Sequence, residues 1–225
     1  MSRALSVIFA IAWKDALSEL RERHAAASML LFAAMVVVIF SFAVQGPQHQ
    51  LHAAPGLIWA TFIFAGLIGQ SRTFGAEERE DCIEGLALCP VSRHLIYLGK
   101  LLAAFILMLL MEGVVLVLFV MFIDLPVASL QLLAAVCVLG TLGFCAIGTL
   151  LSAVSLGGRA RETLLPVLAV PIILPLMIFA VNATQQVLSA QPDLAIVRAG
   201  LQYLAALAVL YTTISALMFE YVLGD

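Results

Sequence analysis

The sequence predicts an all-α, polytopic membrane protein in which residues 1–225 form a single transmembrane domain. Hydrophobic residues make up 64% of the 225 residues and charged residues 11%, about half the charged share of a soluble domain. Apolar runs of roughly 20 residues, the length that crosses the hydrocarbon layer as a helix, occur six times. The segments between these runs are too short to fold into a separate soluble catalytic domain.

Residues 1–24 are predicted to form an amphipathic helix that lies in the membrane interface. Apolar side chains recur at helical spacing, and polar ones fill the rest of the helical wheel. The apolar positions are Leu5, Ile8, Phe9, Ala12, Ala16, Leu17 and Leu20, and the polar ones are Lys14, Asp15, Ser18, Glu19 and Glu22. A cleaved signal peptide is disfavoured, because charged residues follow where a small-residue cleavage site is needed. A plain cytoplasmic tail remains the alternative.

Six transmembrane helices are predicted after this segment. They cover Ala25–Val44, Ala54–Gln70, Leu95–Ile123, Val127–Val154, Thr163–Val181 and Ala199–Val222. Ten of the eleven Lys and Arg residues precede the first span or lie in or beside the connections 71–94 and 155–162, and Arg198 is the eleventh. Short basic connections stay in the cytoplasm, so both termini are predicted to be cytoplasmic, in agreement with an even number of spans.

The connection from Ser71 to His94 is the most polar part of the chain. A helix that starts near Ala76 would place acidic side chains on one face, at i, i+3, i+4 and i+7, beside a small apolar patch. Such a coupling helix, tied to a span on each side, could pass force from a docked cytoplasmic protein to the membrane helices. The expected docking residues are Glu77, Glu78, Glu80, Asp81, Glu84 and Leu86. A solvated loop is the alternative.

Spans four and five have unusual compositions. Small residues between Leu139 and Thr149 allow close contact between helices, and packing is their expected role. Span five carries Pro166, Pro171 and Pro175, each of which removes a backbone hydrogen bond. A kinked or broken helix is therefore predicted, as a gating or substrate-facing surface. The alternative is that the prolines are only tolerated, because proline is common in membrane helices.

Glu112 is the acidic residue that lies well inside a predicted span. A carboxyl group at this depth is expected to be protonated, paired or facing water. A proton relay needs a series of such groups, so a structural hydrogen bond is the predicted role. His49 and His52 lie in the first predicted external loop, where solvated side chains are expected rather than ligands of a metal or of haem.

The sequence predicts no catalytic residue, no directly bound cofactor and no metal site. Phosphate-loop, zinc-protease and serine-hydrolase motifs are missing from it. A net charge of -3 with scattered basic residues disfavours a nucleic-acid partner. The cysteines lack a disulfide context and a metal spacing, and are interpreted as small apolar residues: Cys82, Cys89, Cys137 and Cys145.

Several fragments, taken in order, resemble the CcmB family of haem exporter B permeases. Each fragment is short, but their order and spacing extend over nearly the whole chain. The fragments are Trp13 to Asp15, Glu19 to Arg21, Ala54 to Trp59, Phe74 to Leu86, Pro90, Arg93, Ile96 to Lys100, Leu139 to Gly143 and Arg161 to Pro166. Cys82 and Cys89 depart from the small or apolar residues expected at their positions.

The resemblance implies a six-span permease subunit of ABC-2 type in the bacterial inner membrane, without a nucleotide site of its own and not itself an enzyme. The implied partners are a CcmA-like ATP-binding subunit, a CcmC-like haem-handling subunit, a CcmD-like small subunit, the haem chaperone CcmE and membrane lipid. A complex with two copies of the chain is compatible with it. ATP would bind to the partner subunit, and haem would be handled by the complex.

The expected function is then to couple ATP hydrolysis to haem delivery and to release of the haem-loaded periplasmic chaperone during cytochrome c biogenesis. The acidic connection would dock the ATP-binding subunit. An ABC-2 type exporter of a lipid or drug-like molecule remains the alternative, because it predicts the same topology.

Overall fold

The computed structural model describes residues 2–22, 24–44, 46–71, 73–74, 91–123, 125, 129–155, 161–189 and 191–222. Within these ranges the regular structure is seven helices and no strand. The helices are α1 (Ser2–Glu22), α2 (His24–Ala43), α3 (Pro47–Gln70), α6 (Arg93–Ile123), α7 (Leu130–Val154), α8 (Arg161–Val187) and α9 (Leu194–Val222). The predicted all-α fold is confirmed for these ranges.

Five helices in the described part of the chain are long and apolar enough to cross a membrane. They are α3, α6, α7, α8 and α9, over Gln48–Gln70, Arg93–Ile123, Leu130–Val154, Leu165–Val187 and Leu194–Tyr221. The apolar part of α2, Ala27–Ala43, is shorter. The multi-pass architecture therefore agrees with the sequence, whereas the count of six crossings remains a prediction.

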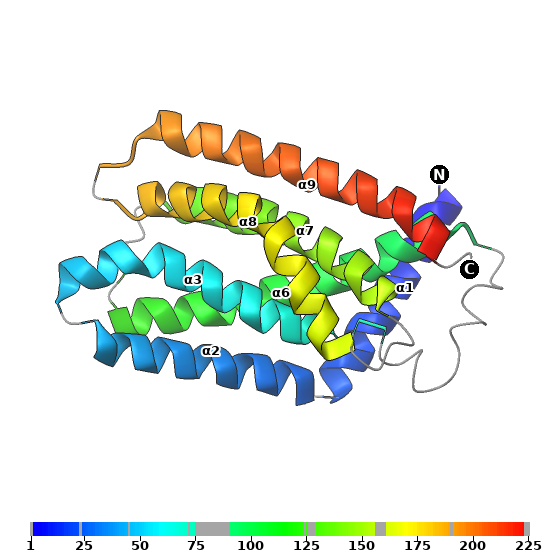
Figure 1. Cartoon of the computed structure of the whole chain (residues 1–225), viewed down its shortest axis with the longest axis horizontal. Helices are drawn as coiled ribbons and strands as arrows, with labels where there is room; N and C mark the ends of the chain where they lie inside the picture. The colour runs from blue at the N-terminus through cyan, green and yellow to red at the C-terminus, as the bar shows by residue number, and fades with distance from the viewer. Residues whose placement is uncertain are drawn as a thin grey trace.

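Figure 1 shows α2, α3, α6, α7, α8 and α9 running along the long axis of the molecule, with successive helices alternating in direction. The two termini lie at the same end of this bundle (Figure 1). Helix α1 crosses that end instead of running along the bundle (Figure 1). This orientation suits a helix that lies in the plane of a membrane interface. We call this end of the molecule the α1 end.

Helix α7 occupies the centre of the bundle and contacts α3, α6, α8 and α9. Every residue from Gly143 to Ala153 is buried. A Cβ atom added at Gly140 would overlap the indole of Trp59, and one at Gly143 would lie 2.8 Å from Leu176 Cδ1. The small residues of this helix therefore permit close packing, in agreement with the role expected for span four.

The helices extend into two segments that the sequence assigned to connections. The predicted connection 45–53 is helical from Pro47, because Gly46 adopts a φ of 94° and Pro47 starts the helix where no N–H is needed. The predicted connection 182–198 is reduced to 188–193. There Asp193 Oδ1 accepts a hydrogen bond from the Ala195 N–H at 2.9 Å, which caps α9. Polar helix ends were the source of both errors.

Candidate functional site

The predicted docking residues belong to the connection between α3 and α6, of which 75–90 lie outside the described residues. This segment includes Glu77, Glu78, Glu80, Asp81, Glu84 and Leu86, so their placement and role stay a prediction. The structure does describe the two stems through which the chain enters and leaves the connection. Thr73 and Phe74 form the first stem, and Val91 and Ser92 form the second. Both stems belong to the region where α3 ends and α6 begins, at the α1 end (Figure 1).

Lys100 of α6 holds the first stem. Its side chain is 1% exposed, and its Nζ donates a hydrogen bond to the Thr73 carbonyl oxygen at 3.0 Å. The same Nζ lies 4.7 Å from the centroid of the Phe74 ring, where the ring quadrupole attracts a cation. Phe74 in turn stacks on Phe219 of α9, with ring centroids 6.2 Å apart. The first stem is therefore fixed on α6 and α9.

The ammonium group of Lys100 also pairs with α1. Its Nζ lies 3.1 Å from Asp15 Oδ2, and the Asp15 side chain is 13% exposed. Lys14 Nζ lies 3.1 Å from the other oxygen of the same carboxylate, but the Lys14 side chain is 60% exposed. A charge is costly to remove from water unless it is paired, so Asp15 and Lys100 permit each other's burial. We call Asp15, Thr73, Phe74, Lys100 and Phe219 the stem cluster.

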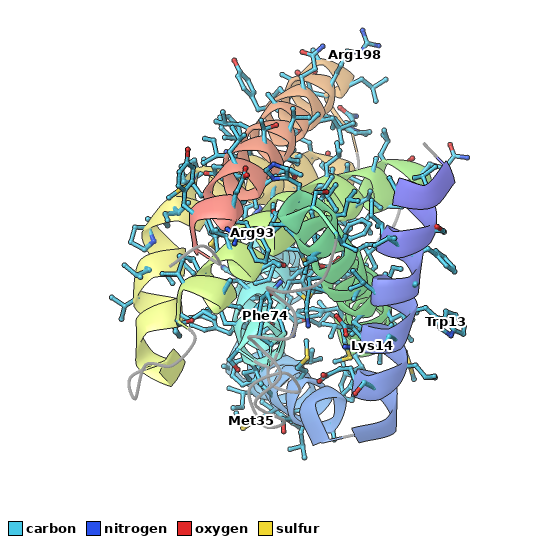
Figure 2. All side chains as sticks on the ribbon, turned by 90° about the vertical axis from the view of Figure 1, so that its right-hand side faces the viewer. Trp13, Lys14, Met35, Phe74, Arg93 and Arg198 are labelled. Atoms are coloured by element: carbon cyan, nitrogen blue, oxygen red, sulfur yellow. The ribbon has the colours of Figure 1, made fainter. Side chains whose placement is uncertain are left out.

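Helix α1 packs closely on α6 beside this cluster. A Cβ atom added at Gly99 would lie 2.8 Å from Ile11 Cβ, so the glycine lets the two helices approach. The predicted apolar face of α1 divides in two, because Ala12 is buried whereas other apolar residues face outward. The outward residues are Leu5, Phe9, Trp13 and Leu17, spaced four apart. Figure 2 shows Trp13 pointing away from the bundle, as a membrane-facing stripe would.

The start of α6, directly after the second stem, is joined to the end of α9. Arg93 Nη1 donates to the Glu220 carbonyl oxygen at 2.8 Å, where a helix C-terminus favours a cation. His94 Nε2 lies 3.1 Å from Glu220 Oε2, and His94 Nδ1 lies 2.9 Å from the Ala216 carbonyl oxygen. The His94 and Glu220 side chains are 40% and 57% exposed. The two stems thus have different surroundings, one buried and one open to solvent.

The end of α3 is also tied to the central helix. Ser152 of α7 donates a hydrogen bond to the Gln70 carbonyl oxygen, and Thr73 Oγ1 donates to Gln70 Oε1 at 3.1 Å. Gly148 allows this contact, since a Cβ atom there would lie 2.7 Å from Gln70 Cδ. A rigid support therefore holds the first stem where it leaves the bundle.

The three prolines of span five lie inside α8, which is continuous from Arg161 to Val187 and visibly bent (Figure 1). A kinked helix was predicted, and a bend is what these prolines produce. Pro171 and Pro175 are on the exposed face of the helix, and Pro166 is half-buried. Tyr211 of α9 donates a hydrogen bond to the Ile172 carbonyl oxygen at 2.6 Å, which supports α8 next to Pro171.

Glu112 is buried in α6, and its Oε1 accepts a hydrogen bond from Thr141 Oγ1 at 2.5 Å. Within the described residues Oε2 has no hydrogen-bond partner. His49 and His52 are exposed, and the described residues contain no group of three or more potential metal ligands. Cys137 and Cys145 are buried free thiols, whereas Cys82 and Cys89 lie outside the described residues.

Sequence reasoning did not identify the Asp15–Lys100 pair. In the sequence, Lys100 is one of the ten basic residues that precede the first predicted span or lie in or beside two predicted connections, and Asp15 belongs to the polar face of the predicted amphipathic helix. A usable signal was present, because Lys100 is the charged residue in an otherwise apolar run from Leu95 to Met111. A charge in such a run needs a partner of opposite charge. The sequence did not show that α1 folds back to provide it.

Comparison with known proteins gives consistent results. The family model described as CcmB protein matches residues 6–223. Heme exporter protein B of Pseudomonas aeruginosa is 29% identical over 221 residues, 96% of this chain and 94% of that protein. Heme exporter protein B of Rhodobacter capsulatus is 29% identical over 159 residues, 70% of this chain and 72% of that protein. Heme exporter protein B of Escherichia coli K12 is 33% identical over 97 residues, 40% of this chain and 44% of that protein.

The family match covers the described helices α2 to α9, the stem cluster and the connection between α3 and α6. The helices long and apolar enough to cross a membrane agree with relatives that are named as exporters. This multi-pass membrane chain belongs to the CcmB protein family.

Proposed function

We propose that this chain is the membrane permease subunit of an ABC transporter complex that exports or delivers haem for cytochrome c biogenesis. A separate CcmA-like subunit hydrolyses ATP, and the chain couples this hydrolysis to release of the haem-loaded chaperone. The chain is then a transporter subunit and not an enzyme. It spans the bacterial inner membrane with both termini in the cytoplasm, where it meets CcmC-like and CcmD-like subunits, with CcmE on the periplasmic side.

The observation that carries the proposal is the family match over nearly the whole chain. The stems support it further. A connection that receives force must be attached firmly to the bundle, and the first stem is held by a buried cation, a backbone hydrogen bond and an aromatic stack. The acidic residues of the connection then supply the surface on which the ATP-binding subunit docks, through Glu77, Glu78, Glu80, Asp81 and Glu84 with Leu86.

Charge reversal in the connection tests this docking. Replacing Glu77, Glu80, Asp81 and Glu84 together by Lys should release the ATP-binding subunit during purification and lower the yield of holo-cytochrome c, while the chain stays inserted. The matched control keeps the charge and changes only the shape, with Asp in place of each Glu and Glu in place of Asp81. Unchanged recovery of the ATP-binding subunit with the reversed variant would contradict the docking proposal.

Purification of the tagged chain in mild detergent tests the identity of the complex. Mass spectrometry should find the CcmA-like subunit together with a CcmC-like protein. Recovery of an ATP-binding subunit without a CcmC-like protein would instead indicate a separate exporter of a lipid or drug-like molecule.

The bend in α8 is proposed to serve turnover. Replacing Pro171 by Ala restores a backbone donor and stiffens the helix, so ATP-driven turnover should fall more than assembly of the complex. Pro175→Ala makes the same change at the other exposed proline of this helix, farther from the Tyr211 contact at Ile172. Comparing the two variants shows whether the effect is specific to Pro171. Equal turnover for the Pro171 variant and the unaltered chain would indicate that this proline is only tolerated.

A further inference from the structure

We propose that the Asp15–Lys100 ion pair is a positioning element that carries movement of the connection 75–90 into α1 and α6. The inference rests on the proposed function, because it assumes that an ATP-binding subunit moves this connection. It goes further by naming the residues through which such movement enters the membrane helices. It also assigns α1 a role in coupling, in addition to lying in the interface.

The first step is the attachment of the first stem to Lys100. The Thr73 carbonyl oxygen accepts a hydrogen bond from Lys100 Nζ at 3.0 Å, and Phe74 is the residue directly before the connection. With Lys100 1% exposed, no solvent layer separates these groups. A displacement of the stem must therefore move the ammonium group or break its hydrogen bond.

The second step is the attachment of Lys100 to α1. If the ammonium group moves away from Asp15 Oδ2, 3.1 Å distant, two charges of opposite sign are left apart in a region of little water. Such a separation is far more costly than breaking an exposed ion pair. Asp15 is therefore drawn along with Lys100. Because α1 packs on α6 through Ile11 and Gly99, the two helices respond as one unit.

The second stem offers a weaker route. His94 Nε2 and Glu220 Oε2 also lie 3.1 Å apart, but their side chains are 40% and 57% exposed. Exposed pairs contribute little, because water and salt screen them. The buried pair at the first stem is therefore the contact that best transmits a displacement.

Hydrogen exchange on the intact complex tests the inference. The complex is purified with its ATP-binding subunit, and exchange measured by mass spectrometry is compared with and without ATP and vanadate. In the unaltered complex, nucleotide should change the exchange of both residues 75–90 and α1. The test variant is Asp15→Asn/Lys100→Met, which removes both charges and leaves no unpaired one buried.

In this double variant, residues 75–90 should still respond to nucleotide, whereas α1 should not. The ATP hydrolysed for each holo-cytochrome c formed should rise by about five- to tenfold, at the lower end of the range of typical couplings between sites. A second neutral pair, Asp15→Asn/Lys100→Gln, repeats the test in case the first variant does not assemble. The matched control is Lys14→Met, which removes the exposed cation from the same carboxylate and should behave as the unaltered chain.

Each outcome has a definite meaning. A preserved α1 response in the double variant, with the ratio of ATP to product unchanged, would overturn the inference and leave the docking proposal intact. The absence of any response in residues 75–90 of the unaltered complex would overturn the docking proposal, and the inference would fall with it. If the pair is merely structural, both neutral double variants should assemble in lower yield, while residues 75–90 and α1 still respond to nucleotide together. This result would also overturn the inference.

Discussion

Two places on α6 put a glycine next to an ionisable residue, and their surroundings differ. At Gly99 and Lys100, the glycine lies against α1 and the lysine contacts Asp15, Thr73 and Phe74. At Glu112 and Gly113, a Cβ atom added to the glycine would meet nothing within 4 Å. The glutamate accepts one hydrogen bond, from Thr141.

The difference shows what a buried charge can do in a membrane helix. Lys100 of α6 contacts both α1 and the first stem. Asp15 of α1 balances its charge, so loss of Lys100 would remove contacts from all three segments. Glu112 lies between two helices of the bundle, and in the described residues its hydrogen bond comes from a hydroxyl group rather than a cation. A charge that joins segments is therefore distinguished by its partners and not by its depth.

The largest effect is expected from Lys100→Met. This change removes the buried cation from Asp15 and leaves the exposed Lys14 beside its carboxylate. Breaking a buried ion pair from one side should lower the free energy of unfolding by about 3–5 kcal/mol. The quantity is measured by titrating the purified chain in mixed micelles with dodecyl sulfate and following far-UV circular dichroism. The double variant Asp15→Asn/Lys100→Met is the control and should recover most of the loss. A loss below about 1 kcal/mol for the single variant, as for exposed pairs, would contradict the buried pair.

The sequence predicted the helical bundle because apolar runs of membrane-spanning length are visible without any tertiary information. It predicted the bend in α8 because the effect of Pro171 on a helix is local. It did not predict the Asp15–Lys100 pair, since 85 positions separate the two residues in the numbering and only the path of α1 across the bundle brings them together. It also assigned buried and exposed residues of α1 to one apolar face, because periodicity cannot tell a residue packed on protein, such as Ala12, from an exposed one, such as Phe9.

An intermediate effect is expected from Gly99→Ala. The added methyl group meets Ile11 Cβ at 2.8 Å and the Ile8 carbonyl oxygen at 3.3 Å, and overpacking of this kind costs about 1–3 kcal/mol. Gly113→Ala is the matched control on the same helix. With open space around it, this change should be neutral or stabilise the chain by up to about 1 kcal/mol. The same unfolding titration measures both variants, and equal effects would contradict the close approach of α1 at Gly99.

The smallest effect is expected from Glu112→Gln. The side-chain oxygen of glutamine can still accept the hydrogen bond from Thr141 Oγ1, so the contact between α6 and α7 is kept. Hydrogen bonds between membrane helices contribute about 0.6 kcal/mol on average, and the change in the free energy of unfolding should not exceed that value. The comparison with Thr141→Val separates the hydrogen bond from the carboxyl group, because only the valine variant removes the donor.

If Glu112→Gln costs far more than Thr141→Val, the carboxyl group must have a partner beyond the hydroxyl, and the contrast with Lys100 fails. If the two changes cost similar small amounts, Glu112 contributes one ordinary hydrogen bond between neighbouring helices. The long-range connection on α6 is then restricted to Lys100. A coupling route through the first stem requires that Glu112 does not link distant segments as Lys100 does. A second such link deeper in α6 would let movement of the connection enter the bundle by another route.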